Sequence, residues 1–349
     1  MMEFYLLDAS LNIITIIDNY KSAIWTSRYF KPGDFELYIP ANAELLQTIE
    51  RGQIIVRTDN VTAGAFIESI KVDTDAEDGN YITIKGKSLA SILARRIVWT
   101  QTTYNGDFEK TVRCLVADNM IEPDDADRTI SVVGLADPIG YSELIKVQFT
   151  GDTVEKAVQS LLEPRKLGYD VFVDIEHKKL NFGILQGVDR SYNQQANPWI
   201  IFSPEYDNLI STSYSNDDSK YSNVAQVAGE GQGIGRKKTV VGSAEGLSRY
   251  ELFVDARNQS TNSGEIDETT YLANLATKGA EKLAERVTVE KISSNVAPNI
   301  GHKFGEDYFL GDVVEVINEY GLQMTPRVTE VTECQDDTGY TCIPKFAAD

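Results

Sequence analysis

The stretch AIWTSRYFKPGDFELYI, residues 23–39, decides the fold class of the first part of the chain. Residues 23–30 are rich in β-forming side chains, Pro32-Gly33-Asp34 is a turn signal, and Phe35–Ile39 resumes the strand pattern. The segment therefore predicts two strands joined by a short turn.

The same pattern continues on both sides of this stretch. Phe4–Leu7 and Ile13–Ile17 are apolar runs bracketed by Asp and Asn, which predicts a hairpin. Further strands are expected at 53–58, 65–73 and 81–86, with short helices at 44–49 and 88–95. Many short strands with regular turns are typical of a small barrel or sandwich, here covering residues 1–96.

The pattern changes after residue 96. Helices are predicted at 107–119 and at 152–162, the second capped by Asp152 or Thr153, followed by a hairpin at 169–175 and 178–182. From residue 198 the chain returns to strands, interrupted by the longest helical pattern, 269–287. The predicted fold class is α+β and β-rich, with two β modules flanking an α+β segment.

Composition excludes several classes of protein. The chain has 349 residues and a net charge of −20, whereas proteins that grip DNA through its phosphates are normally basic. It has no run of about 18 apolar residues to span a membrane, and its first residues lack the basic and apolar regions of a secretory signal. Three cysteines make no disulfide framework, and two histidines leave little for a histidine-based metal site or triad.

The glycine-rich stretch 229–235 fails the test for a dinucleotide-binding loop. Counted from Gly229 or from Gly231, the third glycine of G-x-G-x-x-G is replaced by Ile234 or Arg236, and no Walker lysine follows. The stretch precedes a rare basic cluster, residues 236–238. Gly229, Gly231, Gly233, Gly235 and Arg236 are therefore a candidate contact with a partner or a second subunit, the alternative being an ordinary solvated turn.

No other motif indicates a catalytic, cofactor or metal site. Residues 73–79 resemble a calcium loop, but the glycine is one place late and the bidentate acid is absent, which favours a solvated turn. The chain contains no G-x-S-x-G, H-E-x-x-H or C-x-x-C. Cys114 is expected to be a buried structural thiol, and His177 and His302 to be exposed surface residues. We therefore expect no enzyme and no cofactor.

Cys334 and Cys342 flank the last predicted hairpin. A three-residue loop at 337–339 with Gly339 in the left-handed conformation would place them opposite each other. A disulfide is conceivable, but a pair of free thiols is expected, because that register gives a hydrogen-bonded pair and the chain is made in a reducing cytosol.

Five aromatic residues gather in the stretch that decides the fold: Trp25, Tyr29, Phe30, Phe35 and Tyr38. Core packing and contact between β modules is the expected role, and stacking on a sugar is the alternative.

Several sequence segments, taken in their order along the chain, resemble the siphovirus tail-hub proteins, also called tail-associated or Tal-like proteins. These segments are the Phe4–Ile17 hairpin, 29–40, 52–55, 82–89, 93–96, 229–236 followed by 249–251, 309–314 and 344–346. None of them is a specific motif by itself, but together they cover nearly the whole chain. This family is related to the baseplate hubs of contractile tails and to type VI secretion spikes.

The resemblance implies two small β-barrels like those of the tail tube. They are expected at 1–96 and at 201–258 with 305–349, with a peripheral α+β domain at 97–200 and a helix-bearing insertion at 259–304. Three chains would then present six barrels in a pseudo-sixfold ring. Such a hub joins the tail tube to tip proteins and surrounds the channel through which DNA leaves the virion.

The resemblance also implies partners and a location. The partners are further copies of this chain, distal tail and tail-tube proteins, the tape-measure protein and tail-tip fibre or receptor-binding proteins. The location is the virion tail tip, assembled in the bacterial host. Acidic residues within a Debye length of about 8 Å of the channel would keep DNA from adhering. Some relatives carry a C-terminal hydrolase or receptor-binding extension, which this sequence does not show, so a bare hub is expected.

Two other classes stay open from the sequence. Seventeen tyrosines are compatible with a carbohydrate-binding tail fibre or adhesin. A cell-wall hydrolase would need a pair of carboxylates in a cleft, and nothing in the sequence singles out such a pair.

Overall fold

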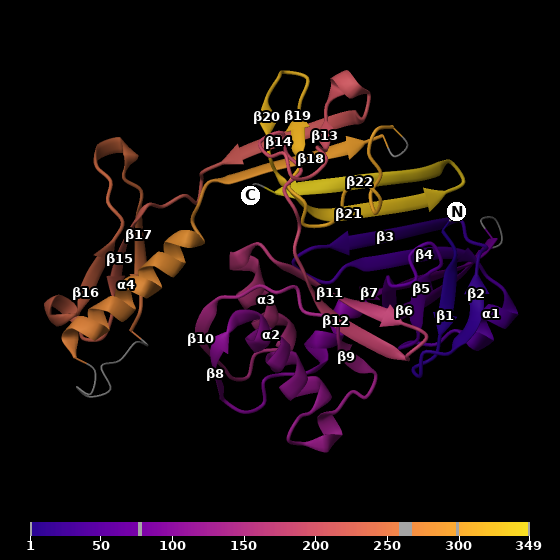
Figure 1. Cartoon of the computed structure of the whole chain (residues 1–349), viewed down its shortest axis with the longest axis horizontal. Helices are drawn as coiled ribbons and strands as arrows, with labels where there is room; N and C mark the ends of the chain where they lie inside the picture. The colour runs from indigo at the N-terminus through magenta and orange to yellow at the C-terminus, as the bar shows by residue number, and fades with distance from the viewer. Residues whose placement is uncertain (1, 76–78, 258–266, 298–299, 348–349) are drawn as a thin grey trace. The chain divides into compact units, whose positions relative to one another are not determined.

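A computed structural model describes residues 2–75, 79–257, 267–297 and 300–347. Contacts divide the chain into two compact units, residues 1–213 with 292–349 and residues 214–291. The four-segment division expected from the sequence stays a prediction. Figure 1 labels the helices and strands that follow.

An eleven-stranded sheet dominates the first unit. Its order is β14-β18-β22-β21-β3-β4-β7-β6-β5-β1-β2, so the last hairpin of the chain lies beside one of its first strands (Figure 1). Short helices α1 (Ala43–Thr48) and η1 (Leu89–Arg95) accompany it. The strands are β1 Phe4–Leu7, β2 Ile13–Ile17, β3 Ser22–Arg28, β4 Asp34–Pro40, β5 Ile54–Arg57, β6 Gly64–Asp75, β7 Gly79–Ser88, β14 Leu209–Asp217, β18 Val289–Val296, β21 Arg327–Asp336 and β22 Gly339–Ala347.

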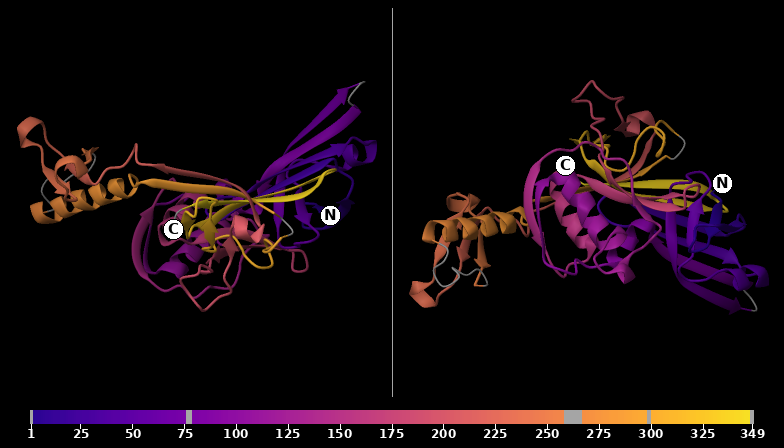
Figure 2. Two further views of the ribbon diagram at one scale, coloured as in Figure 1. Left: turned by 90° about the horizontal axis from the view of Figure 1, so that it is seen from above. Right: turned by 60° about the horizontal axis from the view of Figure 1, so that its bottom comes forward.

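These strands confirm the β-rich α+β fold class and most of the predicted strands. The strand pairs of the described residues do not close a barrel, however. The two predicted β modules instead form parts of one sheet, because β3 pairs with β4 on one side and with β21 on the other. Figure 2 shows the β6–β7 hairpin projecting from this unit.

Both faces of the N-terminal part of the sheet are covered. Alternate side chains point to opposite faces, so Leu7 and Val56 pack in one core while Leu6 and Ile55 pack in another. This explains why β5 is a continuous apolar run rather than an alternating one. The first of these cores is shared with the α+β segment that follows, through residues such as Val158 of its helix α3.

The α+β segment contains the helices that the sequence predicted. Helix α2 begins after Asp107, whose carboxylate accepts the amide N–H of Lys110, and α3 begins after Thr153, whose hydroxyl accepts that of Lys156. Thr153 rather than Asp152 is thus the cap. The elements are β8 Thr102–Asp107, α2 Phe108–Val116 with a π-helical turn Ala117–Ile121, η3 Ala126–Arg128, β9 Val133–Leu135, β10 Leu144–Phe149, α3 Val154–Leu162, η4 Glu163–Arg165, β11 Gly168–Asp174 and β12 Lys179–Leu185.

A small three-stranded sheet completes the first unit beside the last hairpin. Phe202 and Tyr308 pack there with Val316 and Phe346 in a further core. The elements are β13 Ile201–Phe202, η5 Pro204–Tyr206, β19 Glu315–Ile317 and β20 Gln323–Met324.

The second unit has two layers, a helix on a three-stranded sheet. Tyr271 and Leu275 of the helix pack on Ala225 and Val227 of the central strand. The elements are β15 Val224–Ala228, η6 Gly233–Gly235, β16 Lys238–Val241, η7 Gly246–Ser248, β17 Glu251–Asp255 and α4 Glu268–Ala284.

The last hairpin has a tighter turn than expected. Asp336 pairs with Gly339, which leaves the two-residue loop Asp337-Thr338, and the register moves by one. Cys334 therefore faces Thr341, and Cys342 faces Glu333, so the two cysteines lie on opposite faces of the sheet. The three-residue loop that would place the two cysteines opposite each other does not form, and both are free thiols, as expected.

Tyr29 joins three separate segments of the first unit. Its side chain is fully buried, and its hydroxyl lies 2.9 Å from the carbonyl oxygen of Leu185 and accepts the amide N–H of Gly187 at 3.1 Å. Its backbone N–H donates to Thr329. A Cβ at Gly311, where φ is +89°, would lie 2.2 Å from the ring, so only glycine fits there.

Three of the five clustered aromatic residues are core, as expected, whereas Phe30 and Tyr38 are half-buried. Trp25 and Phe35 are buried and stack at 5.8 Å between ring centroids, and Tyr29 is buried as well. Tyr38 is half-buried and stacks on Tyr81 at 4.5 Å. The three buried rings offer no flat surface to a sugar, so Trp25, Tyr29 and Phe35 do not support the carbohydrate-binding alternative.

We predict that Tyr29→Phe lowers the free energy of unfolding by about 1–3 kcal/mol, because the N–H of Gly187 loses its acceptor in a partly buried position. Denaturant unfolding measures the loss. Tyr320→Phe, at a side chain that is 87% exposed, is the control and should change stability by less than about 0.5 kcal/mol. Equal effects of the two variants would show that Tyr29 does not hold these segments.

Candidate functional site

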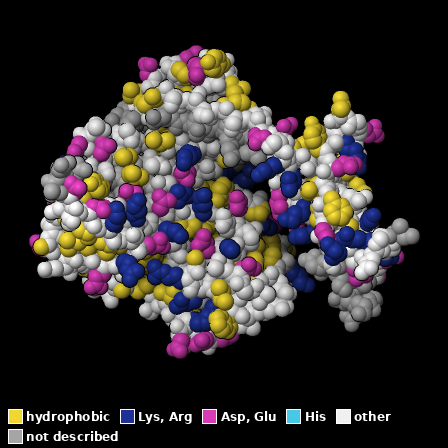
Figure 3. Space-filling model, turned by 180° about the vertical axis from the view of Figure 1, so that it is seen from behind, with side chains coloured by type: hydrophobic (Ala, Val, Ile, Leu, Met, Phe, Trp, Pro, Cys, Tyr) yellow, Lys and Arg dark blue, Asp and Glu magenta, His cyan; other side chains and the backbone are white. Residues whose placement is uncertain are grey.

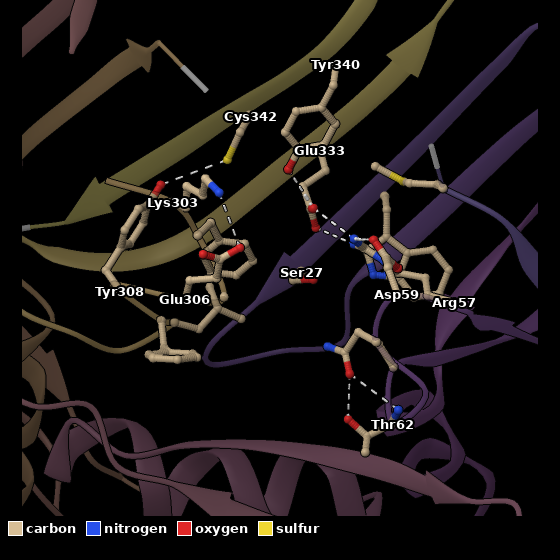
Figure 4. Close-up of a pocket in the computed structure, with 18 of the residues that line it drawn as sticks. Ser27, Arg57, Asp59, Thr62, Lys303, Glu306, Tyr308, Glu333, Tyr340 and Cys342 are labelled. Atoms are coloured by element: carbon tan, nitrogen blue, oxygen red, sulfur yellow. Dashed lines mark hydrogen bonds and ion pairs between the residues drawn. The ribbon is translucent and has the colours of Figure 1, made fainter. Parts of the chain in front are cut away.

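A pocket of about 830 Å³ lies within the first unit and is its candidate site (Figure 4). Strands β3, β21 and β22, the β5–β6 connection and the segment 302–310 contribute to its wall, together with residues of β11 and β12. The pocket thus lies where the N-terminal strands, the α+β segment and the last hairpin meet. Its aromatic side chains include Trp25, Phe172, Phe304 and Phe309.

A buried ion pair forms one wall of this pocket. The guanidinium of Arg57 donates through both terminal nitrogens to the carboxylate of Glu333, one bond measuring 3.0 Å, and through Nε to Asp59 at 2.9 Å. The hydroxyl of Tyr340 donates to Glu333 at 2.8 Å. Figure 4 shows these four side chains pointing toward one another. Arg57 and Glu333 are separated by 276 positions, so the pair ties the start of the chain to its end.

This network fixes the protonation states of its members. Burial alone would lower the pKa of Arg57, but its hydrogen bonds to Asp59 and Glu333 and their charges raise it. Burial, followed by the charge of Glu333, raises the pKa of Tyr340. Burial likewise raises the pKa of the Cys342 thiol to about 11, so Cys342 is protonated at neutral pH.

The opposite wall is formed by the segment 302–310. The hydroxyl of Tyr308 lies 3.9 Å from the Cys342 sulfur, and Lys303 forms an ion pair with Glu306 at 3.6 Å. His302 is half-buried, its ring 5.8 Å from that of Phe202, and its Nε2 faces the N–H of Ile201 at 3.4 Å. Burial lowers the pKa of His302. The expectation that His302 is an exposed surface residue was wrong, because its loop folds back onto the core around Phe202.

Glu333 and Cys342 of this pocket do not form a nucleophile with a free general base. Glu333 is committed to Arg57 and Tyr340, and the Cys342 thiol is held protonated. Nucleophilic catalysis needs an activated nucleophile beside an available base. The arrangement is suited instead to holding three segments of the chain in place.

Asp170 is a carboxylate at the pocket whose pKa is raised. The side chain is half-buried, and its carboxylate accepts the amide N–H of Val171 at 2.8 Å. Burial raises its pKa to about 6, against the opposing effect of that hydrogen bond. Ionisation of Asp170 therefore works against folding.

The other sequence-level candidates lie apart from this pocket. His177 is exposed, as expected, and its Nδ1 lies 2.8 Å from Asp174. Cys114 is half-buried on α2 rather than buried. The calcium-like stretch 73–79 falls partly outside the described residues. Within the described ranges, no group of three or more His, Cys, Asp or Glu side chains is placed to hold a metal ion.

The glycine-rich loop lies in the second unit, and Arg236 folds back to hold it. The Arg236 guanidinium donates to the carbonyl oxygens of Gly229, at 2.8 Å, and Ala228, and it pairs with Asp255 at 2.5 Å. A Cβ at Gly229 would lie 2.1 Å from the Tyr271 hydroxyl, so helix α4 requires glycine there. The structure therefore brings Gly229 and Arg236 together as an internal anchor.

The remaining predicted residues lie at the surface. Gly231, Gly233 and Gly235 are exposed, and the first two have φ of +99° and +54°.

Beyond the loop, Gln226 pairs with Val240 on one side and with Phe253 on the other, which places the three side chains on one face of the sheet. Val240 and Phe253 are 56% and 57% exposed. Figure 3 shows hydrophobic side chains among Lys and Arg on the face of this unit that it presents.

The sequence did not predict the Arg57–Glu333 pair or the pocket. Both depend on the pairing of β3 with β21, which joins segments about 300 positions apart. The sole local signal for a buried ion pair is Arg57, which ends an apolar run. If that strand is buried, the charge of Arg57 needs an acidic partner.

The comparisons with known proteins agree with the fold. The chain belongs to the family of Siphovirus ReqiPepy6 Gp37-like proteins, whose model matches residues 3–346. This confirms the resemblance to siphovirus tail proteins. No curated protein sequence matches the chain.

Solved structures of tail proteins share the fold over its whole length. The tail protein from Neisseria meningitidis MC58 has a TM-score of 0.63 at 13% identity, covering 100% of this chain and 97% of that one. The 43 kDa tail protein of prophage MuSo2 from Shewanella oneidensis has a TM-score of 0.63 at 15% identity, covering 99% and 98%. The lidded PdpA–VgrG complex of Francisella has a TM-score of 0.54 at 10% identity, covering 100% and 53%.

The chain is thus a phage tail protein. In the described residues, no helix is both long and apolar enough to cross a membrane.

We predict that Arg57→Met lowers the free energy of unfolding by about 3–5 kcal/mol, because Glu333 is left charged and buried. The loss should be smaller when Arg57→Met is made in a Glu333→Gln background. Lys21→Met is the control, since the pair of Lys21 with Asp337 is exposed, and it should cost less than about 0.5 kcal/mol. Denaturant unfolding measures all four variants, and equal losses with and without Glu333→Gln would contradict coupling between Arg57 and Glu333.

We predict that Asp170→Asn stabilises the protein by about 1 kcal/mol at pH 8. The pKa of Asp170 is higher in the folded chain than in the unfolded one. Its ionisation therefore costs nothing at low pH, and the cost grows as pH rises from about 4 to about 6. Unfolding free energies at pH 4.5 and pH 8 should show the gain shrinking at the lower pH. Asp337→Asn, at an exposed carboxylate, should show no such change, and a gain at Asp170 independent of pH would contradict this assignment.

Proposed function

We propose that this chain is the structural hub of a bacteriophage or prophage-derived tail tip. Three copies form a pseudo-sixfold ring that joins the sixfold tail tube to tip and fibre proteins and surrounds the DNA exit channel. The observation that carries this proposal is the pairing of β3 with β21, which gives each chain two β modules in one continuous sheet. Three chains with two modules each match a sixfold tube.

The net charge supports a channel role. A chain with a net charge of −20 that surrounds DNA repels phosphate at distances up to the Debye length, about 8 Å at physiological salt. The first β module, residues 1–96, and the part of the second module that lies in the first unit, residues 201–213 with 305–349, are the proposed walls of this channel. DNA passes without specific binding.

A non-enzymatic role is part of the proposal. It is supported by the pocket, in which Arg57, Glu333 and Tyr340 are bonded to one another and tie the beginning of the chain to its end. It is also supported by the fold, shared over the whole chain with tail proteins. The tape-measure protein, distal tail proteins and tip fibres are the proposed partners.

The second unit is proposed as a contact with such a partner. Its exposed loop at Gly231, Gly233 and Gly235 and its uncovered face with Val240 and Phe253 support this role. Arg236 supports this contact indirectly, because its guanidinium holds the loop in place through Gly229 and Asp255.

We predict that the purified chain has a mass of three copies by light scattering, each of 38.8 kDa, and forms rings with a central hole in negative-stain images. Added salt up to 0.5 M should leave the rings intact if apolar contacts between copies hold them. A monomer at all concentrations would contradict the trimer, and a ring with a basic channel would contradict the charge mechanism.

A further inference from the structure

Strand β11 forms a wall of the pocket in the first unit that is separate from the Arg57–Glu333 pair. Asp170 and Phe172 lie two positions apart on this strand, and both line the pocket. Val171 between them is buried in the core on the other face of the strand. A carboxylate and an aromatic ring therefore face the same cavity from one strand.

The ring of Phe172 lies beside the Asp170 carboxyl group. Asp170 pairs directly with Gly183 of β12, so the position opposite it bears no side chain. A Cβ at Gly183 would lie 2.8 Å from Cε2 of Phe172, because the ring leans across this position. Cβ atoms of directly paired residues lie about 4.5–5.5 Å apart, so the ring and the carboxyl group are neighbours. Glycine at 183 thus leaves room for the ring next to Asp170.

In the described part of the chain, Asp170 has no cationic partner. The Lys and Arg side chains that line the pocket there are Arg57 and Lys303, and both are paired with other carboxylates (Figure 4). Burial raises the pKa of Asp170, the N–H of Val171 opposes this rise, and no charged side chain of the described residues contributes. An ionised carboxylate in such surroundings opposes folding until a positive group joins it.

The rest of the pocket suits an organic cation. Trp25, Phe304 and Phe309 add aromatic rings to its lining, and the face of an aromatic ring attracts a positive charge. A carboxylate accepts strong charge-assisted hydrogen bonds from ammonium and guanidinium groups. The volume of about 830 Å³ has room for the alkyl chain that carries such a group, since pockets for small ligands span about 300–1,000 Å³.

We propose that this pocket binds an organic cation, whose ammonium or guanidinium group pairs with Asp170 and lies against Phe172. Two sources share this chemistry: a lysine or arginine side chain of another tail protein, and a free diamine. The proposal adds a ligand to the pocket beyond the structural role of Arg57 and Glu333. It rests on the pocket alone and does not depend on the trimeric ring.

Blocked amino acids test the site by isothermal titration of the full-length chain. The probes are the N-acetyl-N-methylamides of lysine, of arginine and of norleucine, the last being the neutral match of lysine. Salt at about 150 mM screens the general attraction of cations to an acidic chain. We expect a cationic probe to bind at least about tenfold more tightly than norleucine, because it adds a charge-assisted hydrogen bond. Equal binding of all three probes, or binding of none, would overturn the proposal.

Asp170→Asn shows whether this carboxylate is the group responsible. The variant should lose the preference for a cationic probe and yet unfold at higher denaturant concentration than the wild type, as predicted above. Asp337→Asn is the matched control, since it removes one charge from a side chain that is 76% exposed and outside the pocket. It should leave the preference unchanged. A preference that persists in Asp170→Asn, or an equal loss in both variants, would overturn a site at Asp170.

Two further measurements address the ring and the source of the cation. Phe172→Leu keeps an apolar side chain but removes the ring, so it should weaken the cationic probes about two- to fivefold. Unchanged affinity would contradict contact between the cation and this ring. Tighter binding of 1,5-diaminopentane than of blocked lysine would indicate a free diamine, and the reverse would indicate a protein segment. A monomer that binds the probes would contradict the trimeric hub and leave this site standing.

Discussion

Strand β3 pairs on both sides, and the architecture of the first unit depends on this. Its partner β4 is local, but its partner β21 comes from the end of the chain. Arg28 and Glu330 face each other across this second pairing and form a 2.6 Å ion pair. Directly after the strand, Tyr29 fills the space between Gly168 and Gly311. One strand and one side chain thus hold the beginning, middle and end of the unit together.

The buried charges follow from the same pairing. Because β21 lies against β3, Glu333 lies opposite Trp25 and reaches Arg57. A lone Arg57 on a buried strand would carry a large desolvation cost, which Glu333 and Asp59 offset. The pocket beside them is a junction of segments, and its protonated Cys342 and committed carboxylates agree with a structural role.

Local features were predictable from the sequence, because they depend on near neighbours. The helices at 107–119 and 152–162, the choice of Asp152 or Thr153 as the cap of the second, and most strands were read from periodicity and turn residues. The β3–β21 pairing was not, since nothing in either strand specifies its partner. The turn at Asp337-Thr338 shows that sequence patterns can fail at short range too. A loop of two residues instead of three shifts the strand register by one, so Cys334 does not face Cys342.

Electron cryo-microscopy of intact tails that contain this chain would show whether it forms a trimeric ring at the tail tip. We expect three copies at one end of the tail, each contributing two β modules around an acidic channel. Six copies in a ring, or copies repeated along the tube, would contradict it.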